Sequence, residues 1–497
     1  MRKKMDAQNP NGFFCYLFLA SAMCLTCLAL PVRAQLAAPQ SLTLSCVHVY
    51  PIQKKYLEKH VNFDDMTRNL EVRTIDQFIE RLDPTELYLK VSDVKAIKKT
   101  MAGIFEKSQK KDCSKIQKAY GLFKKRVKER VDFAKKFLGK KFKLNKKTKL
   151  RLDPDERERS KTVAEANAFH RKYIQYQVAT YLATDMKLKK AKDQVKRNYE
   201  RVLKRINERN KTDLFSFYLD SFSRGMDPHS SYLSQEDLED FEIQMRLSLE
   251  GIGATLSSRD GFTVIEQLIP GGAAFRSGKL KPKDKIIAVG QGKKGDYKTV
   301  IEKQLRDVVR LIRGPKDSVV RLKVLRKKGE DTKRFEVSLV RDKIKLEDEA
   351  ASVKYFDRQV QGAKRKVALL TLPSFYADNR KNGRSAARDV KKLLKKVKKE
   401  KADAMVLDLS LNGGGSLRDA VEIAGLFFMF FNVVKQSQRA TAKGKVHYEV
   451  LRDTNEDVNY SGPLVVLISR ISASASEIVS GTLQDYERAV VVGGDHT

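Results

Sequence analysis

The stretch LVVLISRISASASEIVSGTL, residues 464–483, joins an apolar run to a helical pattern through a series of serines. Residues 464–468 predict a buried strand, and residues 472–483 predict a helix. A serine at such a junction can be exposed, and the first turn of the helix offers backbone N–H groups and a positive dipole to an oxyanion. A plain serine N-cap explains the same local pattern equally well.

The segments around this stretch alternate between apolar strands and helices. Strands are predicted at residues 367–372, 404–409 and 489–492, and helices at residues 386–401 and 420–431. Such alternation is typical of an α/β layer whose strands pair in parallel.

A glycine-rich segment, Asn412-Gly413-Gly414-Gly415, follows the strand predicted at residues 404–409. Three glycines after a strand allow close approach of another backbone and provide N–H groups, which suits the second half of an oxyanion hole. A flexible turn is the alternative. A phosphate-binding loop is less favoured, because no Lys-Ser/Thr pair follows the glycines.

The composition changes at Gly251, from which a β-rich, glycine-punctuated region extends to about Asp342. Strands are predicted at residues 262–265, 286–289 and 319–325, and a helix at residues 299–311. The turn before these strands can hold the carboxylate of a peptide that adds to the strand edge; its residues are Leu249, Glu250, Gly251, Ile252 and Gly253. An ordinary β-bulge or turn is the alternative.

The region before this one is helical. Ile75, Phe78, Ile79 and Leu82 share one helix face, and Asp83-Pro84 ends that helix. Residues 156–209 are highly charged and lack glycine and proline, which predicts long helices.

The first residues form a targeting segment. A basic start at residues 2–4 precedes an uncharged apolar run at residues 13–30, and Val32-Arg33-Ala34 offers a cleavage site after Ala34. An uncleaved N-terminal anchor is the alternative. Cys15, Cys24 and Cys27 lie in this segment. Cys46 and Cys113 remain, and a disulfide between them or two unpaired thiols are equally compatible with the sequence.

The chain has 497 residues and a net charge of +37, spread over lysine-rich stretches. Nucleic-acid binding is one interpretation of such a charge, but an export signal separates the protein from nucleic acid. Solvated helix faces are therefore expected, with contact to an anionic envelope surface as a minor alternative. The cysteines and histidines lack metal-site spacing, so neither a metal nor a cofactor is expected.

Five segments, in this order, resemble the C-terminal-processing peptidases of the tail-specific branch. They are residues 221–233, with Asp227-Pro228-His229-Ser230-Ser231-Tyr232-Leu233; residues 251–253; residues 270–274, followed by Gly278 and Asp284-Lys285-Ile286; residues 407–409 with 412–417; and residues 472–485. The resemblance extends from about residue 36 to the last residue.

The resemblance implies a serine nucleophile and a lysine general base. It places the nucleophile at Ser474, the oxyanion hole at Gly414 and the amide of Ala475, and supporting acidic positions at Glu477 and Asp485. A desolvated lysine can be a neutral amine and take the hydroxyl proton.

Two features depart from the family pattern. Ser410 stands where the family usually has an arginine in the glycine-rich loop. The resemblance places the lysine, in a Gly-Lys-Gly motif, a few residues beyond Thr497, so we expect a truncated catalytic domain that is inactive as written.

Together these inferences predict a multidomain α+β protein. Residues 1–34 are a signal peptide, 35–238 a helical N-terminal domain, 239–342 a PDZ-like domain, and 343–497 a C-terminally incomplete α/β catalytic core of the crotonase/Clp type.

The expected function is that of a serine endopeptidase that recognises apolar C-terminal tails of envelope proteins. Its partners would be unfolded or tailed substrates and an adaptor protein, and its location the periplasm, with or without association with the inner membrane. The alternatives are a PDZ adaptor or truncated homologue without activity, and a Ser-His-Asp hydrolase that uses His447 or His496.

Overall fold

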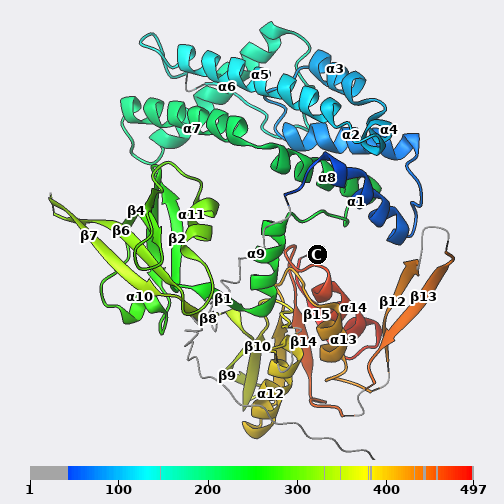
Figure 1. Ribbon diagram of the computed structural model, residues 1–497. Helices are drawn as coiled ribbons and strands as arrows, with labels where there is room; N and C mark the ends of the chain where they lie inside the picture. Colours follow the sequence, from blue (N-terminus) through cyan, green and yellow to red (C-terminus); the bar gives the residue numbers. More distant parts are fainter. Residues whose placement is uncertain are drawn as a thin grey trace, which may run out of the picture. The chain divides into compact units, whose positions relative to one another are not determined.

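The computed structural model describes residues 43–145, 147–329, 331–346, 349–378, 380, 383–429, 431–439, 444–454 and 457–494. The signal peptide predicted at residues 1–34 lies outside the described residues. Three hydrophobic cores organise the remainder: one among the N-terminal helices, one inside a β-rich region and one around a C-terminal sheet. Figure 1 shows the helices and strands of these three regions. The predicted multidomain fold class is confirmed.

The first core lies among helices, as the sequence predicts. They are α1 (Cys46–Lys59), α2 (Arg68–Leu82), α3 (Val91–Met101), α4 (Ile104–Gln109), α5 (Ser114–Phe137), α6 (Val163–Leu182), α7 (Leu188–Glu208), α8 (Lys211–Met226) and α9 (Gln235–Arg246). The predicted apolar face is buried in α2, which ends at its C-cap Asp83 before Pro84.

Cys46 and Cys113 form a disulfide that ties α1 to the start of α5, with 5.8 Å between their Cα atoms. This decides between the two alternatives that the sequence left open. Disulfides form and persist in oxidising compartments. No helix in the described part of the chain is both long enough and apolar enough to cross a membrane.

The second core belongs to an antiparallel sheet. Its strands are β2 (Ala254–Arg259), β3 (Phe262–Leu268), β4 (Lys285–Gln291), β6 (Val319–Lys328) and β7 (Asp331–Val340), in that order, with β5 (Tyr297–Thr299) paired to β4. Helices α10 (Ala273–Arg276) and α11 (Leu305–Ile312) accompany the sheet. A separate pair joins β1 (Ser248–Gly251) to β8 (Asp342–Lys345).

The helix predicted at residues 299–311 is wrong in its first turns. Thr299 pairs with Ala288 as part of β5, and Glu302 has a φ of 61°, which a right-handed helix does not allow. The helix therefore begins at Leu305.

The third core surrounds a sheet of order β15-β14-β11-β10-β9. Strands β10 (Ala363–Thr371), β11 (Ala404–Asp408), β14 (Leu464–Leu467) and β15 (Val490–Val492) are parallel, as predicted, and β9 (Ser352–Val360) adds an antiparallel edge. The helices are α12 (Ala386–Lys399), α13 (Leu417–Ala424) and α14 (Ala475–Asp485), and β12 (Asn432–Arg439) and β13 (Val446–Arg452) form a hairpin.

Three predicted helices have different bounds here, and the one predicted at residues 386–401 ends at Lys399. The helix predicted at residues 420–431 begins at Leu417, because Ser416 caps it through the Asp419 N–H, and ends at Ala424. The next residue, Gly425, lies so close to Asp453 that a Cβ would be 2.1 Å from the carboxyl carbon. The helix predicted from Ser472 begins at Ala475, because its N-cap residue Ser474 has a φ of 55°, which a right-handed helix does not allow.

Candidate active site

Ser474 lies at the N-cap of α14 in an unusual backbone conformation, with φ 55° and ψ −114°. An ordinary serine N-cap has an extended backbone. Conformations of this kind cost about 1–3 kcal/mol in a residue other than glycine, and they concentrate at functional sites. A strained turn from a strand into a helix is also how some hydrolases expose a nucleophilic serine. The geometry therefore favours a nucleophile over a plain cap.

The glycine-rich loop contacts this serine directly. A Cβ built on Gly414 would lie 2.8 Å from the Cβ of Ser474, 2.8 Å from the Ala473 carbonyl oxygen and 3.2 Å from the Ala475 nitrogen. Gly414 has a φ of 105°, so only glycine fits both the space and the backbone. The structure thus brings together two segments that the sequence marked separately.

Asn412 holds the loop in place, a role that sequence reasoning missed. Its side chain is fully buried, donates to the Leu372 carbonyl at 2.8 Å and accepts from the Gly414 N–H at 2.9 Å. Its backbone carbonyl accepts from the Ser476 hydroxyl at 2.7 Å. One residue therefore ties the loop to α14 and to Leu372, the residue after β10, and its place directly before the glycines was the only signal.

The two predicted oxyanion donors differ in their surroundings. The Ala475 N–H belongs to the first turn of α14, where backbone N–H groups have no partner within the helix. The Gly414 N–H donates to Asn412 instead, so in this structure it is engaged within its own loop.

The two predicted acidic residues lie at opposite ends of α14. Glu477 accepts a hydrogen bond from the Ser474 backbone N–H at 2.5 Å, so it fixes the backbone conformation of Ser474. Asp485 is the last residue of the helix and is exposed. Ten helical steps of about 1.5 Å place it roughly 15 Å along the axis from Ala475, the residue after Ser474.

Ser410, the departure from the family pattern, has its own local role. Its backbone N–H and hydroxyl both donate to the Asp408 carboxylate, at 2.9 and 2.6 Å. The Ser469 hydroxyl donates to the Ser410 carbonyl, and the Ser472 hydroxyl donates to the Leu409 carbonyl at 2.8 Å. Side-chain hydroxyls thus join the end of β11 to the segment before Ser474.

The predicted carboxylate-binding turn is only partly a turn: Leu249, Glu250 and Gly251 lie in β1 and pair with β8, which corrects the prediction for them. Only Ile252 and Gly253 lie between β1 and β2. Ile252 is buried in the hydrophobic core of the antiparallel sheet that contains β2, and its carbonyl accepts a hydrogen bond from the Ala274 N–H at 2.7 Å. Gly253 has a φ of 73°, and a Cβ there would lie 2.9 Å from the Cα of Gly272. Packing thus fixes the turn that leads into β2.

A pocket of about 420 Å³ adjoins this turn. Leu249 and Glu250 line it together with the cations Arg313 and Lys343 and several carboxylates of α9. Positively and negatively charged side chains therefore both line this pocket.

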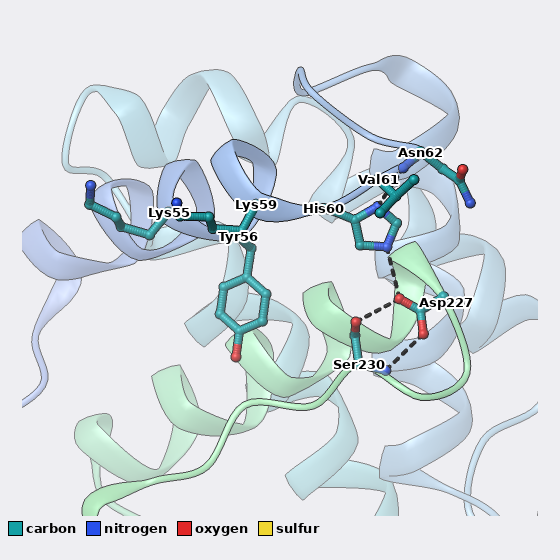
Figure 2. Close-up of a pocket in the computed structure, with 8 residues that line it drawn as sticks. All are labelled: Lys55, Tyr56, Lys59, His60, Val61, Asn62, Asp227 and Ser230. Atoms are coloured by element: carbon teal, nitrogen blue, oxygen red, sulfur yellow. Dashed lines mark hydrogen bonds and ion pairs between the residues drawn. The ribbon is translucent and has the colours of Figure 1, made fainter. Parts of the chain in front are cut away.

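Asp227 and Ser230 of the Asp227-Pro228-His229-Ser230 segment form a cluster with His60, drawn in Figure 2. The cluster lies beside a pocket of about 630 Å³. The carboxylate of Asp227 lies between the other two side chains, 2.8 Å from His60 Nε2 and 2.6 Å from the Ser230 hydroxyl. Partial burial opposes ionisation, but hydrogen bonds from Ser230 and His60 outweigh it and lower the pKa of Asp227 to about 2. A hydrolase triad needs the histidine in the middle, so this cluster is structural.

The alternative histidine bases gain no support from the described residues. His447 is exposed in β13, opposite Gln438 of β12. His496 lies outside the described residues.

Three family models match successive parts of the chain. Residues 52–236 match the tail specific protease N-terminal domain, residues 240–325 the PDZ domain and residues 366–497 the peptidase family S41. The chain is 34% identical over 436 residues to the tail-specific protease of Haemophilus influenzae, covering 88% of this chain and 60% of that protein. It is 29% identical over 270 residues to the carboxy-terminal-processing protease of Bartonella bacilliformis, covering 54% of this chain and 56% of that one. The chain thus spans less than two thirds of the length of these relatives.

Two solved structures are also similar. The PDZ domain of a carboxy-terminal protease from Vibrio cholerae, determined in complex with a peptide, is 50% identical over 20% of this chain and all of that one, with a TM-score of 0.19. The photosystem II D1 C-terminal processing protease is 22% identical over 59% of this chain and 73% of that one, with a TM-score of 0.28.

The order of the matched domains and the extent of the Haemophilus match agree with the helical region, the antiparallel sheet and the α/β sheet that carries Ser474. The chain therefore belongs to peptidase family S41, in its tail-specific protease branch, with a tail-specific N-terminal domain and a PDZ domain before the peptidase domain.

Proposed function

We propose that this protein is a serine endopeptidase of the C-terminal-processing type, with Ser474 as its nucleophile. The observation that carries the proposal is the strained backbone of Ser474 at the N-terminus of α14, directly against Gly414. Membership of family S41 supports the same chemistry.

In the proposed reaction, the Ser474 hydroxyl attacks the carbonyl carbon of the scissile peptide bond. A lysine amine, contributed by a segment beyond Thr497, takes the hydroxyl proton and later delivers it to the leaving amine. The Ala475 N–H stabilises the oxyanion, and the Gly414 N–H joins it after leaving Asn412. Glu477 supports the reaction by holding the Ser474 backbone. Water then releases the acyl group.

The proposed substrates are unfolded envelope proteins with apolar C-terminal tails. The tail would add as a strand beside β2, with its carboxylate at residues 249–253, where β1 leads into β2. Lys343 in the adjoining pocket is a cation for an anionic end group, whereas Arg313 is already paired with Asp240 of α9. The Vibrio cholerae PDZ domain, crystallised with a peptide, supports this mode of recognition.

The proposed location is the periplasm, in solution or at the inner membrane. The disulfide between Cys46 and Cys113 supports an oxidising compartment. The predicted signal peptide at residues 1–34 would take the chain there.

The test is cleavage of an unfolded model protein with an apolar C-terminal tail, using protein that includes the segment expected to carry the lysine. Ser474→Ala should abolish turnover and leave tail binding intact. The matched control is Ser476→Ala, which loses only a bond to the Asn412 carbonyl and should keep most activity. Turnover by Ser474→Ala would refute the nucleophile, and tail binding without cleavage by the wild type would indicate a PDZ adaptor.

A further inference from the structure

An apolar groove lies on the helical domain, far in sequence from the serine site. It has a volume of about 560 Å³, within the range of about 300–1,000 Å³ typical of ligand pockets. One wall is a stripe of α6 formed by Tyr176, Ala179 and Leu182, which recur every three residues. The other wall is the loop after α5, which contributes Leu150 and Leu152.

Hydrogen bonds hold the loop wall against α6. Gln175 is buried on α6, and its side-chain oxygen accepts from the Asn145 N–H at 3.1 Å. Its side-chain nitrogen donates to the Lys143 carbonyl at 3.0 Å. These hydrogen bonds therefore fix the shape of the groove. Two of its apolar side chains are exposed to solvent: Leu152 is 46% exposed and Tyr176 is 43% exposed.

The loop wall is strongly basic. Between Gly139 and Leu152 the chain carries seven lysines and arginines and no acidic residue. Of the cations that flank the groove leucines, Lys147, Lys149 and Arg151 are exposed. An occupant of this groove meets an apolar floor and a positively charged rim.

We propose that this groove binds an acidic amphipathic helix of a partner protein. The partner's apolar stripe, at i, i+3/i+4 and i+7 spacing, fills the groove, and its aspartates and glutamates face the basic loop. Charge complementarity of this kind directs the encounter and selects the partner, while burial of the apolar stripe supplies most of the affinity.

The shape of the surface favours a protein helix over an anionic membrane. Peripheral membrane segments present an apolar face that enters the headgroup region. Here the leucines line a hollow between α6 and the loop. A helix fits such a hollow, because side-chain ridges of one helix pack into grooves beside another.

The experiment is fluorescence anisotropy of the purified protein with a labelled probe peptide of about eighteen residues, long enough to form a helix. The probe carries leucines at i, i+3/i+4 and i+7 and glutamates elsewhere. Two control peptides replace the leucines with serines or the glutamates with lysines. Measurements at about 0.1 M salt limit non-specific attraction to this basic protein.

Two variants test the two parts of the groove. The double variant Leu152→Ser/Tyr176→Ser removes exposed apolar anchors, so folding should be unaffected, and should weaken probe binding by at least about tenfold. The triple variant Lys147→Glu/Lys149→Glu/Arg151→Glu should weaken it by a similar factor. Its matched control, Lys395→Glu/Lys398→Glu/Lys399→Glu, makes the same charge change on the exposed face of α12 and should change affinity less than about twofold.

Three results would overturn the proposal. The first is equal binding of the probe by the wild type and the Leu152→Ser/Tyr176→Ser variant, which would indicate charge attraction alone. The second is an equal loss of affinity in the α12 control. The third is binding to vesicles of anionic phospholipid that the groove variants abolish, with no binding of the probe peptide, which would assign the surface to a membrane.

Discussion

Replacement of Gly414 by alanine tests the contact between the glycine-rich loop and Ser474. The new Cβ would lie 2.8 Å from both the Ala473 carbonyl oxygen and the Ser474 Cβ. Overpacking of this kind costs about 1–3 kcal/mol, and a φ of 105° adds roughly 1–3 kcal/mol for a residue with a side chain. The neighbours are backbone and Cβ atoms, which cannot rotate away. Either the loop stays in place and the free energy of unfolding falls by this amount, or the loop moves.

The matched control is Gly413→Ala, one residue earlier. There the nearest atom to a new Cβ is the Ile471 carbonyl oxygen at 4.0 Å, and the backbone is not left-handed. The two variants add the same methyl group to the same loop, so their difference measures the close contacts of Gly414 and its backbone strain together.

The assay measures both stability and catalysis. The chain has no tryptophan, so calorimetry is a suitable measure of unfolding. If the free energy of unfolding falls by about 3 kcal/mol, the transition temperature of the catalytic region should fall by roughly 6–12 °C. If the loop moves by about 1 Å, the cleavage rate should fall roughly a hundredfold. Equal behaviour of Gly414→Ala and Gly413→Ala in both measurements would refute the reasoning.

Three further predictions concern other parts of the chain. Burial, and then repulsion by Arg130, lower the pKa of His170 to about 3, so between about pH 6.5 and 3 only the unfolded state gains a proton on this side chain. The free energy of unfolding should therefore fall by about 1.4 kcal/mol for each pH unit between pH 6.5 and 3. In urea titrations, His170→Gln should remove this slope. Replacing Cys46 and Cys113 with serines opens a crosslink between residues 67 positions apart and should destabilise the helical domain by about 4 kcal/mol, measured by denaturant unfolding; an unchanged midpoint would show that the disulfide does not constrain the unfolded chain. Amidating the C-terminus of an apolar peptide should weaken its binding to the PDZ region, whereas equal affinity of the acid and the amide in calorimetric titration would exclude carboxylate capture.

The strands and the α/β alternation could be predicted because short apolar runs between polar turns leave few other structures. The errors lie at helix ends, where single residues decide. The positive φ of Glu302 delays the start of α11, and the Ser416 cap starts α13 three residues before the predicted start. Neither effect has a periodic signal in the sequence.

The site was predictable in its parts and less so in its contacts. The resemblance selected Ser474 and the glycines, and the structure places Gly414 against Ser474. The role of Asn412 depends on Leu372 and Ser476, which are 40 and 64 residues away, and no local pattern encodes such bonds. For the same reason the sequence did not reveal that Asn412 engages the Gly414 N–H.

The most direct test of the central claim is to trap the covalent intermediate. Protein that includes the segment after Thr497 would be mixed with a short tailed peptide and quenched in acid during turnover. Mass spectrometry of the digested protein would then locate any ester-linked substrate fragment. We predict an acyl group on Ser474, absent from Ser474→Ala. An acyl group on Ser472 or Ser476, or rapid turnover without any acylated serine, would contradict the account.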